Sequence, residues 1–214
     1  MSSPPETAPK VLIEAPPRSP TLSAEVWNLP NALTLLRIFL VPFLVVVLLT
    51  RFSGREYAGL AIFLVAAITD FFDGYIARKR NQMTRLGALL DPIADKLLMA
   101  TAFVVLAYVK ILPVWLAVLV ISRDLFILTG SVLILLLHGE GRIRTTIISK
   151  ANTVVQVFTV IYFLAVRAFP GVWEIAPAGA EATAKAVVVG MCALTTAISG
   201  LHYLSIGMRQ ITNE

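Results

Sequence analysis

Charged side chains are scarce in this sequence. Asp, Glu, Lys and Arg make up only 14% of its 214 residues, whereas 57% are hydrophobic and the mean hydropathy is +0.82. A water-soluble domain cannot cover that much apolar surface with so few polar groups. The composition therefore excludes a soluble protein and indicates an integral membrane protein.

Cysteine is almost absent as well, since Cys192 is the single one. One cysteine excludes a disulfide framework within the chain, and its apolar surroundings predict a small, buried packing residue. The net charge is only +5, and the basic residues lie between apolar stretches. There they orient membrane spans and contact anionic lipids, so we do not expect nucleic acid as a partner.

An internal repeat is also lacking, and residues 21–214 are interpreted as one membrane domain. Residues 1–20 are rich in proline and polar residues, so we expect a disordered cytoplasmic tail rather than a signal peptide. Residues 21–28 are predicted to form a short interfacial helix. Apolar stretches then predict an all-α integral membrane fold, a six-transmembrane-helix bundle with spans at 29–50, 58–78, 86–108, 113–137, about 150–168 and 182–207.

Basic residues outside these spans predict the orientation of the bundle. With the N-terminus inside, the cytoplasmic segments contain Lys10, Arg18, Arg78, Lys79, Arg80, Arg85, Arg142, Arg144, Lys150 and Arg209. The outer segments contain only Arg51, Arg55, Lys110 and Arg167. We therefore expect the segment around residues 79–85 at the cytoplasmic face, in a bacterial inner membrane.

Four carboxylates lie close to that segment, inside otherwise apolar stretches. On helices, Asp70 and Asp73 share one face and Asp91 and Asp95 share another. Each Asp at the centre of a span costs roughly 2.5–3.5 kcal/mol, so the four together would cost on the order of 10 kcal/mol without compensation. Two divalent cations would balance four carboxylates in charge, and hard cations such as Mg²⁺ prefer oxygen ligands. The residues thus predict a metal site.

Small and basic residues accompany the carboxylates. Gly74 and Gly87 leave room for a ligand or another backbone, and the planar guanidinium of Arg78 suits phosphate recognition. The whole stretch, called the acidic motif below, reads Asp70-x2-Asp73-Gly74-x2-Ala77-Arg78-x8-Gly87-x3-Asp91-x3-Asp95. It resembles the complete signature of the CDP-alcohol phosphatidyltransferase family, with no departure.

The resemblance implies a metal-dependent enzyme of phospholipid synthesis. An alcohol would attack the lipid-side phosphorus of CDP-diacylglycerol and release CMP. Two Mg²⁺ or Mn²⁺ ions would be held by the four Asp residues, and Asp95 would also take the proton from the acceptor hydroxyl. Many members resembling this chain are homodimers, so we expect a homodimer here. The residues implied around the nucleotide are Asn31, Thr34, Asp70, Asp73, Gly74, Ala77, Arg78 and Gly87.

The remaining basic residues suit the phosphate of the acceptor. Arg37 lies on the same helical face as Asn31 and Thr34, and a charge inside a span should face the bundle interior. Neighbours in a helix sequence do not face each other, so we expect Arg123 and Asp124 to have separate partners. The predicted acceptor-phosphate residues are Arg123, Arg142, Arg144 and Lys150.

The identity of the acceptor stays open between two branches of the family. The run at residues 30–43 and the C-terminal SGLHYLSIG resemble enzymes that use glycerol 3-phosphate, the acceptor that we favour. The runs ISRD and ISKANTVVQ are more similar to cardiolipin synthases, which use phosphatidylglycerol, and the Arg123-Asp124 pair departs from the Arg-Glu expected in the first branch. Another alcohol acceptor is a third alternative.

A divalent-cation transporter is a distant alternative, because intramembrane acids also mark ion pathways. Such a carrier has its charges near the bilayer midplane, and its halves are often related by a repeat. Here the acids gather towards one face and no second copy is apparent, which favours the enzyme.

Overall fold

The described part of the chain is helical. The computed structural model describes residues 29–80, 85–138 and 146–212, with side chains at 32–69, 93–130 and 146–206. Across these ranges, which contain no strand, the helices are α2 (Leu29–Leu49), α3 (Arg55–Arg80), α4 (Arg85–Tyr108), α5 (Val114–His138), α6 (Ile147–Ala168), α7 (Gly171–Glu174) and α8 (Ala180–Thr212).

Each of the six apolar stretches forms a helix, as the sequence predicts. The short helix α7 was not predicted, because it lies between two predicted spans, directly after Pro170. The expected tail at 1–20 and interfacial helix at 21–28 lie outside the described residues. Three described segments are long and apolar enough to cross a membrane: Ala32–Leu49, Ile147–Ala168 and Ala180–Ile206.

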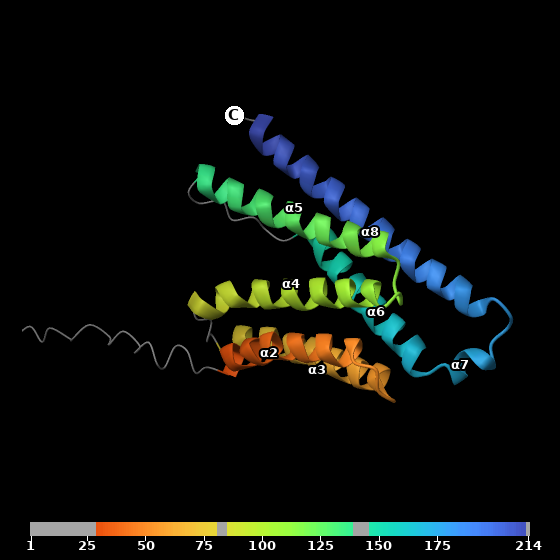
Figure 1. Ribbon diagram of the computed structural model, residues 1–214. Helices are drawn as coiled ribbons and strands as arrows, with labels where there is room; N and C mark the ends of the chain where they lie inside the picture. Colours follow the sequence, from red (N-terminus) through yellow and green to blue (C-terminus); the bar gives the residue numbers. More distant parts are fainter. Residues whose placement is uncertain (1–28, 81–84, 139–145, 213–214) are drawn as a thin grey trace, which may run out of the picture.

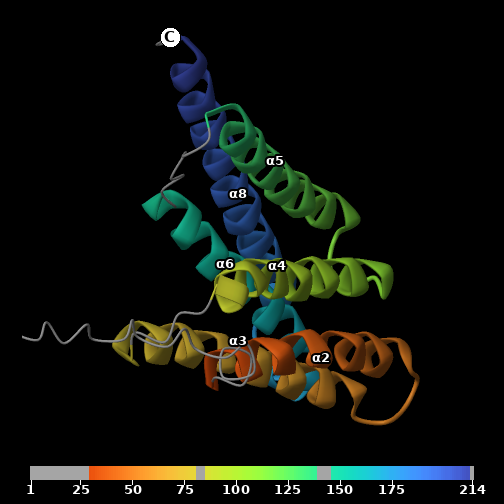
Figure 2. The same ribbon diagram turned by 90° about the vertical axis from the view of Figure 1, so that its left-hand side faces the viewer.

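The helices form two groups that α6 connects. Helices α2, α3 and α4 run side by side, and α2 packs against both of the others (Figures 1 and 2). Helix α5 packs against α8 on the other side of α4. Helix α6 crosses between the groups and contacts α3 as well as α8. The bundle thus brings helices that are distant in sequence around one interior.

The core of the bundle is apolar and so is much of its surface. Leu44, Phe63 and Phe103, from three different helices, are fully buried in one hydrophobic cluster. Outward-facing side chains such as Phe39 and Val118 are also apolar, with 63% and 58% of their surface exposed. Lipid tails can cover such a surface at no cost, which agrees with a membrane protein. Cys192 is fully buried in the core, as expected.

A glycine allows the close approach of α2 and α3. A Cβ atom added to Gly59 would lie 2.5 Å from Cδ2 of Leu48, which is itself only 3% exposed. On α8, two glycines differ in how much room surrounds them. A Cβ on Gly200 would lie 3.7 Å from Cγ of Arg123, whereas a Cβ on Gly190 would meet nothing within 4 Å.

We predict that Gly59→Ala destabilises the bundle relative to Gly130→Ala by about 1–3 kcal/mol, the usual cost of overpacking a core. Both substitutions raise helix propensity equally, but a Cβ on Gly130 meets nothing within 4 Å. Thermal unfolding of the two purified variants in mild detergent measures the difference. Equal stability would mean that α2 and α3 separate easily to make room.

Candidate active site

The acidic motif occupies the end of α3 and the beginning of α4. Asp70 and Asp73 lie in the second half of α3, whereas Asp91 and Asp95 lie in the first half of α4. The end of α3 and the beginning of α4 lie at the same end of the bundle, on the left in Figure 1. The backbone therefore carries both halves of the motif to one end of the molecule.

Only Asp95 of the motif belongs to the residues with described side chains, and it is partly exposed. Among the described residues, no group of three or more His, Cys, Asp or Glu is placed to hold a metal ion. The donor set of the motif, four carboxylates on two successive helices, still fits hard divalent cations. The predicted site residues with side chains outside the described set are Asn31, Asp70, Asp73, Gly74, Ala77, Arg78, Gly87, Asp91, Arg142 and Arg144.

Two predicted polar residues of α2 face the interior. The side chains of Thr34 and Arg37 are both fully buried, and Arg37 is the largest fully buried side chain among those that the structure describes. They begin an inward stripe that continues one turn at a time with Val41, Leu44 and Leu48. The expectation that Arg37 faces the bundle interior is confirmed.

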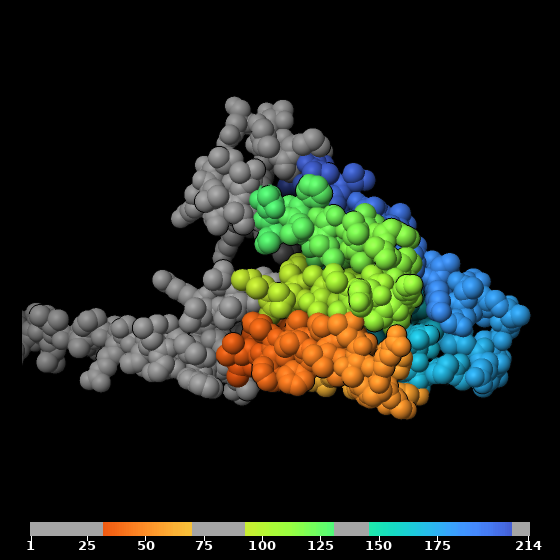
Figure 3. All heavy atoms as spheres, in the orientation of Figure 1, coloured from red at the N-terminus to blue at the C-terminus, as the bar shows by residue number. Residues whose placement is uncertain are grey.

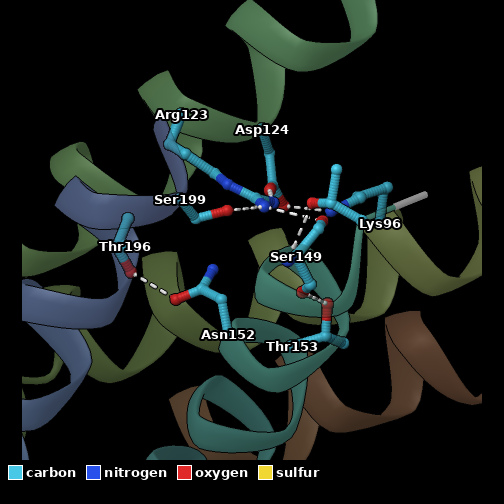
Figure 4. A network of polar contacts seen from close by, with 9 residues as sticks. Lys96, Arg123, Asp124, Ser149, Asn152, Thr153, Thr196 and Ser199 are labelled. Atoms are coloured by element: carbon cyan, nitrogen blue, oxygen red, sulfur yellow. Dashed lines mark hydrogen bonds and ion pairs between the residues drawn. The ribbon is translucent and has the colours of Figure 1, made fainter. Parts of the chain in front are cut away.

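Arg123 connects α5 to α6 and α8 (Figure 4). Its Nη2 donates to Oγ of Ser149 at 2.8 Å and also to Oγ of Ser199. Its guanidinium lies 5.9 Å from the centre of the Tyr203 ring, a cation–π distance. Because the side chain is only 4% exposed, these contacts replace water around a buried charge.

Asp124 lies between two cations. Its Oδ1 accepts from Nη1 of Arg123 at 2.7 Å, and its Oδ2 lies 2.7 Å from Nζ of Lys96 on α4. Arg123 and Asp124 also contact each other, although adjacent residues do not face each other on a helix. Neighbouring Cβ atoms diverge on a helix, but the long arginine side chain reaches back to the carboxylate. Each residue also has a further partner, as expected, and the pair joins α4 to α5.

A polar stripe between α6 and α8 was missed from the sequence. Asn152, Gln156 and Thr159 are buried along one face of α6, and Oγ1 of Thr196 on α8 donates to Oδ1 of Asn152 at 3.0 Å. Amide and hydroxyl groups commonly connect helices in membranes this way. These three polar residues are spaced by four and three positions in an otherwise apolar helix, which places them on one helical face and could have indicated a contact with another helix.

Lys150, another predicted acceptor residue, is exposed in the first turn of α6. This helix begins at a Thr146 cap, whose side chain accepts a hydrogen bond from the Ser149 backbone. Ser149 in turn contacts Arg123. The cap thus positions Lys150 next to the residue that holds Arg123. Arg123 and Lys150 therefore lie near each other, one inside the bundle and the other at its surface.

Comparisons with known proteins identify a family. The family described as CDP-alcohol phosphatidyltransferase matches residues 27–199. A CDP-diacylglycerol–glycerol-3-phosphate 3-phosphatidyltransferase of Bacillus subtilis is 38% identical over 148 residues, covering 63% of this chain and 75% of the relative.

Two further relatives align over most of this chain. A probable phosphatidylglycerophosphate synthase of Mycobacterium tuberculosis is 33% identical over 206 residues, covering 94% of this chain and 92% of the relative. The human cardiolipin synthase (CMP-forming) is 30% identical over 212 residues, covering 92% of this chain and 67% of the relative. The chain is therefore similar both to relatives named for glycerol-3-phosphate transfer or its product and to a cardiolipin synthase.

We predict that Asp124→Ala lowers the free energy of unfolding by about 3 kcal/mol, because it leaves the buried Arg123 guanidinium without its carboxylate. The matched change Lys96→Ala removes the other, 42% exposed partner and should cost less than about 1 kcal/mol. Unfolding of both variants in mild detergent measures the two losses. Similar losses would contradict a structural role of the Arg123–Asp124 pair.

Proposed function

Because the chain belongs to the CDP-alcohol phosphatidyltransferase family, we propose that it transfers a phosphatidyl group from CDP-diacylglycerol to the hydroxyl of glycerol 3-phosphate. The observation that carries this proposal is the complete acidic motif at one end of helices α3 and α4. Relatives from Bacillus subtilis and Mycobacterium tuberculosis are named for this reaction or its product. The enzyme would serve phospholipid synthesis and release CMP.

The metal ligands in this proposal are Asp70, Asp73, Asp91 and Asp95. Two Mg²⁺ or Mn²⁺ ions, when bound, would neutralise the pyrophosphate and stabilise charge on the attacking and leaving oxygens. The four negative charges of the carboxylates would balance the four positive charges of two divalent ions. The partial exposure of Asp95 supports its access to a substrate.

Asp95 is the proposed general base. Its carboxylate would take the proton from the acceptor hydroxyl while the acceptor oxygen bonds to the lipid-side phosphorus. The bond from that phosphorus to the CMP oxygen breaks, and CMP leaves. A base must lie within about 2.6–3.2 Å of the group it deprotonates, so the acceptor would bind beside the beginning of α4.

The nucleotide half of the site would combine α2 with the motif. Thr34 is buried on α2, which packs against α3 and α4. Its hydroxyl would contact the nucleotide together with Asn31, and Arg78 would bind phosphate. Around them, Gly74, Ala77 and Gly87 would admit the cytidine because their side chains are absent or small. Asp70 and Asp73 would contribute to the same half through the metals.

The acceptor half would lie near α5 and α6. Among the described residues, Nε of Arg123 is buried without a hydrogen-bond partner, which leaves one donor for a phosphate oxygen. Lys150 is exposed nearby, and the segment that contains Arg142 and Arg144 directly precedes α6. These residues would hold the acceptor phosphate beside Asp95.

The membrane topology in this proposal has six spans. Helices α3, α4 and α5 have 26, 24 and 25 residues, and about 20 residues suffice to cross the hydrocarbon core. The positive charges then favour an active site at the cytoplasmic face, in a bacterial inner membrane. We also propose a homodimer, as in many members that this chain resembles.

Cardiolipin synthesis is the second candidate. The human cardiolipin synthase aligns with 92% of this chain, and the runs ISRD and ISKANTVVQ resemble that branch. Its acceptor, phosphatidylglycerol, also carries a phosphate, so the same basic residues would suit it. The two candidates differ in whether the acceptor arrives from water or from the membrane.

We predict that glycerol 3-phosphate gives a phosphatidylated product and CMP when the purified protein receives CDP-diacylglycerol and Mg²⁺. Phosphatidylglycerol and other alcohols, offered separately, should give less product by mass spectrometry. Chelator should stop the reaction, and Mg²⁺ or Mn²⁺ should restore it. Product from phosphatidylglycerol alone would favour the second candidate, and full activity after metal removal would contradict the metal site.

We predict that Asp95→Asn lowers turnover by about 10²–10⁴-fold, the usual contribution of a positioned base, while CDP-diacylglycerol still binds. Binding of the donor and formation of CMP are measured separately. The control Glu174→Gln changes an exposed carboxylate in α7 and should leave turnover unchanged. Near-normal turnover of Asp95→Asn would show that the proton goes elsewhere.

A further inference from the structure

A basic hollow lies at the end of the bundle opposite the acidic motif. It has a volume of about 1170 Å³ and forms where the α2–α3 and α4–α5 connections approach each other, at the right-hand end in Figure 1. Arg51, Arg55 and Lys110 line it, and Glu56 is the one acid among its described lining residues. The hollow therefore carries a net positive charge at a face to which the proposed reaction assigns no role.

Two of the three cations are available to a ligand. Arg55 donates from Nε to Oε1 of Glu56 at 2.9 Å. Among the described residues, neither Arg51 nor Lys110 forms an ion pair with a carboxylate. An anion entering the hollow would thus find unneutralised positive charge.

Lys110 occupies a backbone position that favours glycine. Its φ is +59°, in the left-handed region. The Lys110 N–H bonds to the Ala107 carbonyl and the Ile111 N–H to the Leu106 carbonyl, a pattern that closes a helix with a left-handed residue, usually glycine. A lysine here works against the backbone preference and adds a cation to the lining of the hollow.

An apolar groove continues from the hollow between α2 and α4. The two share Leu49 and Tyr108 in their linings. The groove has a volume of about 420 Å³, and its other lining residues are Val45, Ala100, Thr101, Val104 and Val105. Figure 3 shows α2 lying against α4 on the face turned to the viewer. A cationic end joined to an apolar groove matches the two halves of a phospholipid.

We propose that this end of the bundle binds one anionic phospholipid. Its phosphate lies among Arg51, Arg55 and Lys110, and one acyl chain follows the groove between α2 and α4. Asp70 lies 15 residues along α3 from Arg55, or about 22 Å at 1.5 Å per residue. The lipid site is therefore separate from the acidic motif, and it does not depend on the proposed reaction.

The test compares two lipids with the same acyl chains. Native mass spectrometry of the delipidated full chain measures binding of dioleoyl phosphatidic acid and dioleoyl phosphatidylcholine, and neither is a substrate of the proposed reaction. Phosphatidic acid should bind at least about tenfold more tightly, the effect of one or more charge-assisted contacts. Equal affinities would overturn the proposal.

Lys110→Gly is the informative variant, because it removes the cation while satisfying the backbone preference. It should weaken phosphatidic acid binding about tenfold or more without lowering thermal stability. The control Lys185→Gln also removes one positive charge, but Lys185 does not line the hollow and pairs with Glu181. This control should bind like the wild type, and equal weakening by both changes would mean a general charge effect.

A second variant distinguishes a lipid from free phosphate. Ala100→Phe puts bulk into the apolar groove and leaves all three cations in place. It should weaken phosphatidic acid binding, and inorganic phosphate in large excess should not displace the lipid from the wild type. If Ala100→Phe binds the lipid normally and phosphate displaces it, the hollow is a phosphate site and the lipid assignment is wrong.

Discussion

The guanidinium of Arg123 can lie inside the bundle only because oxygen-bearing side chains from three helices and one aromatic ring surround it. An apolar environment strongly disfavours an unpaired charge, so these contacts fix how α5, α6 and α8 pack. Asp124 extends the network to Lys96, the neighbour of Asp95 on α4. The packing of α5, α6 and α8 beside the candidate site thus depends on the buried charge of Arg123.

Length and hydropathy were sufficient to predict the six long helices. For α2 and α4 the ends agree to within one residue with the predicted stretches 29–50 and 86–108, because apolar runs and charged connections coincide. Length and hydropathy could not predict which side chains contact Arg123. Ser149 and Ser199 lie 26 and 76 positions away, and no local pattern indicates which serines an arginine will meet. Helix α7 was missed for a related reason, since one turn carries too little periodicity.

The acidic motif and the acceptor side of the candidate site differ in how well the sequence predicts them. The acidic motif is recognisable from the spacing of its carboxylates and small residues along α3 and α4, and the family match agrees with it. The acceptor side has no such spacing, since Arg123 and Lys150 belong to different helices, α5 and α6. Asp124 illustrates the difference. Both its oxygens contact cations, so Asp124 has a structural role that does not involve the acceptor.

The two ends of the α2–α3–α4 group have opposite chemistry. One end concentrates carboxylates, which need cations, and the other concentrates cations, which need an anion. Glu56 neutralises only part of the second end. Within a membrane, an anionic lipid headgroup can supply that anion. The lysine at the left-handed end of α4 is then understandable, because a glycine there would close the helix equally well but would contribute no charge.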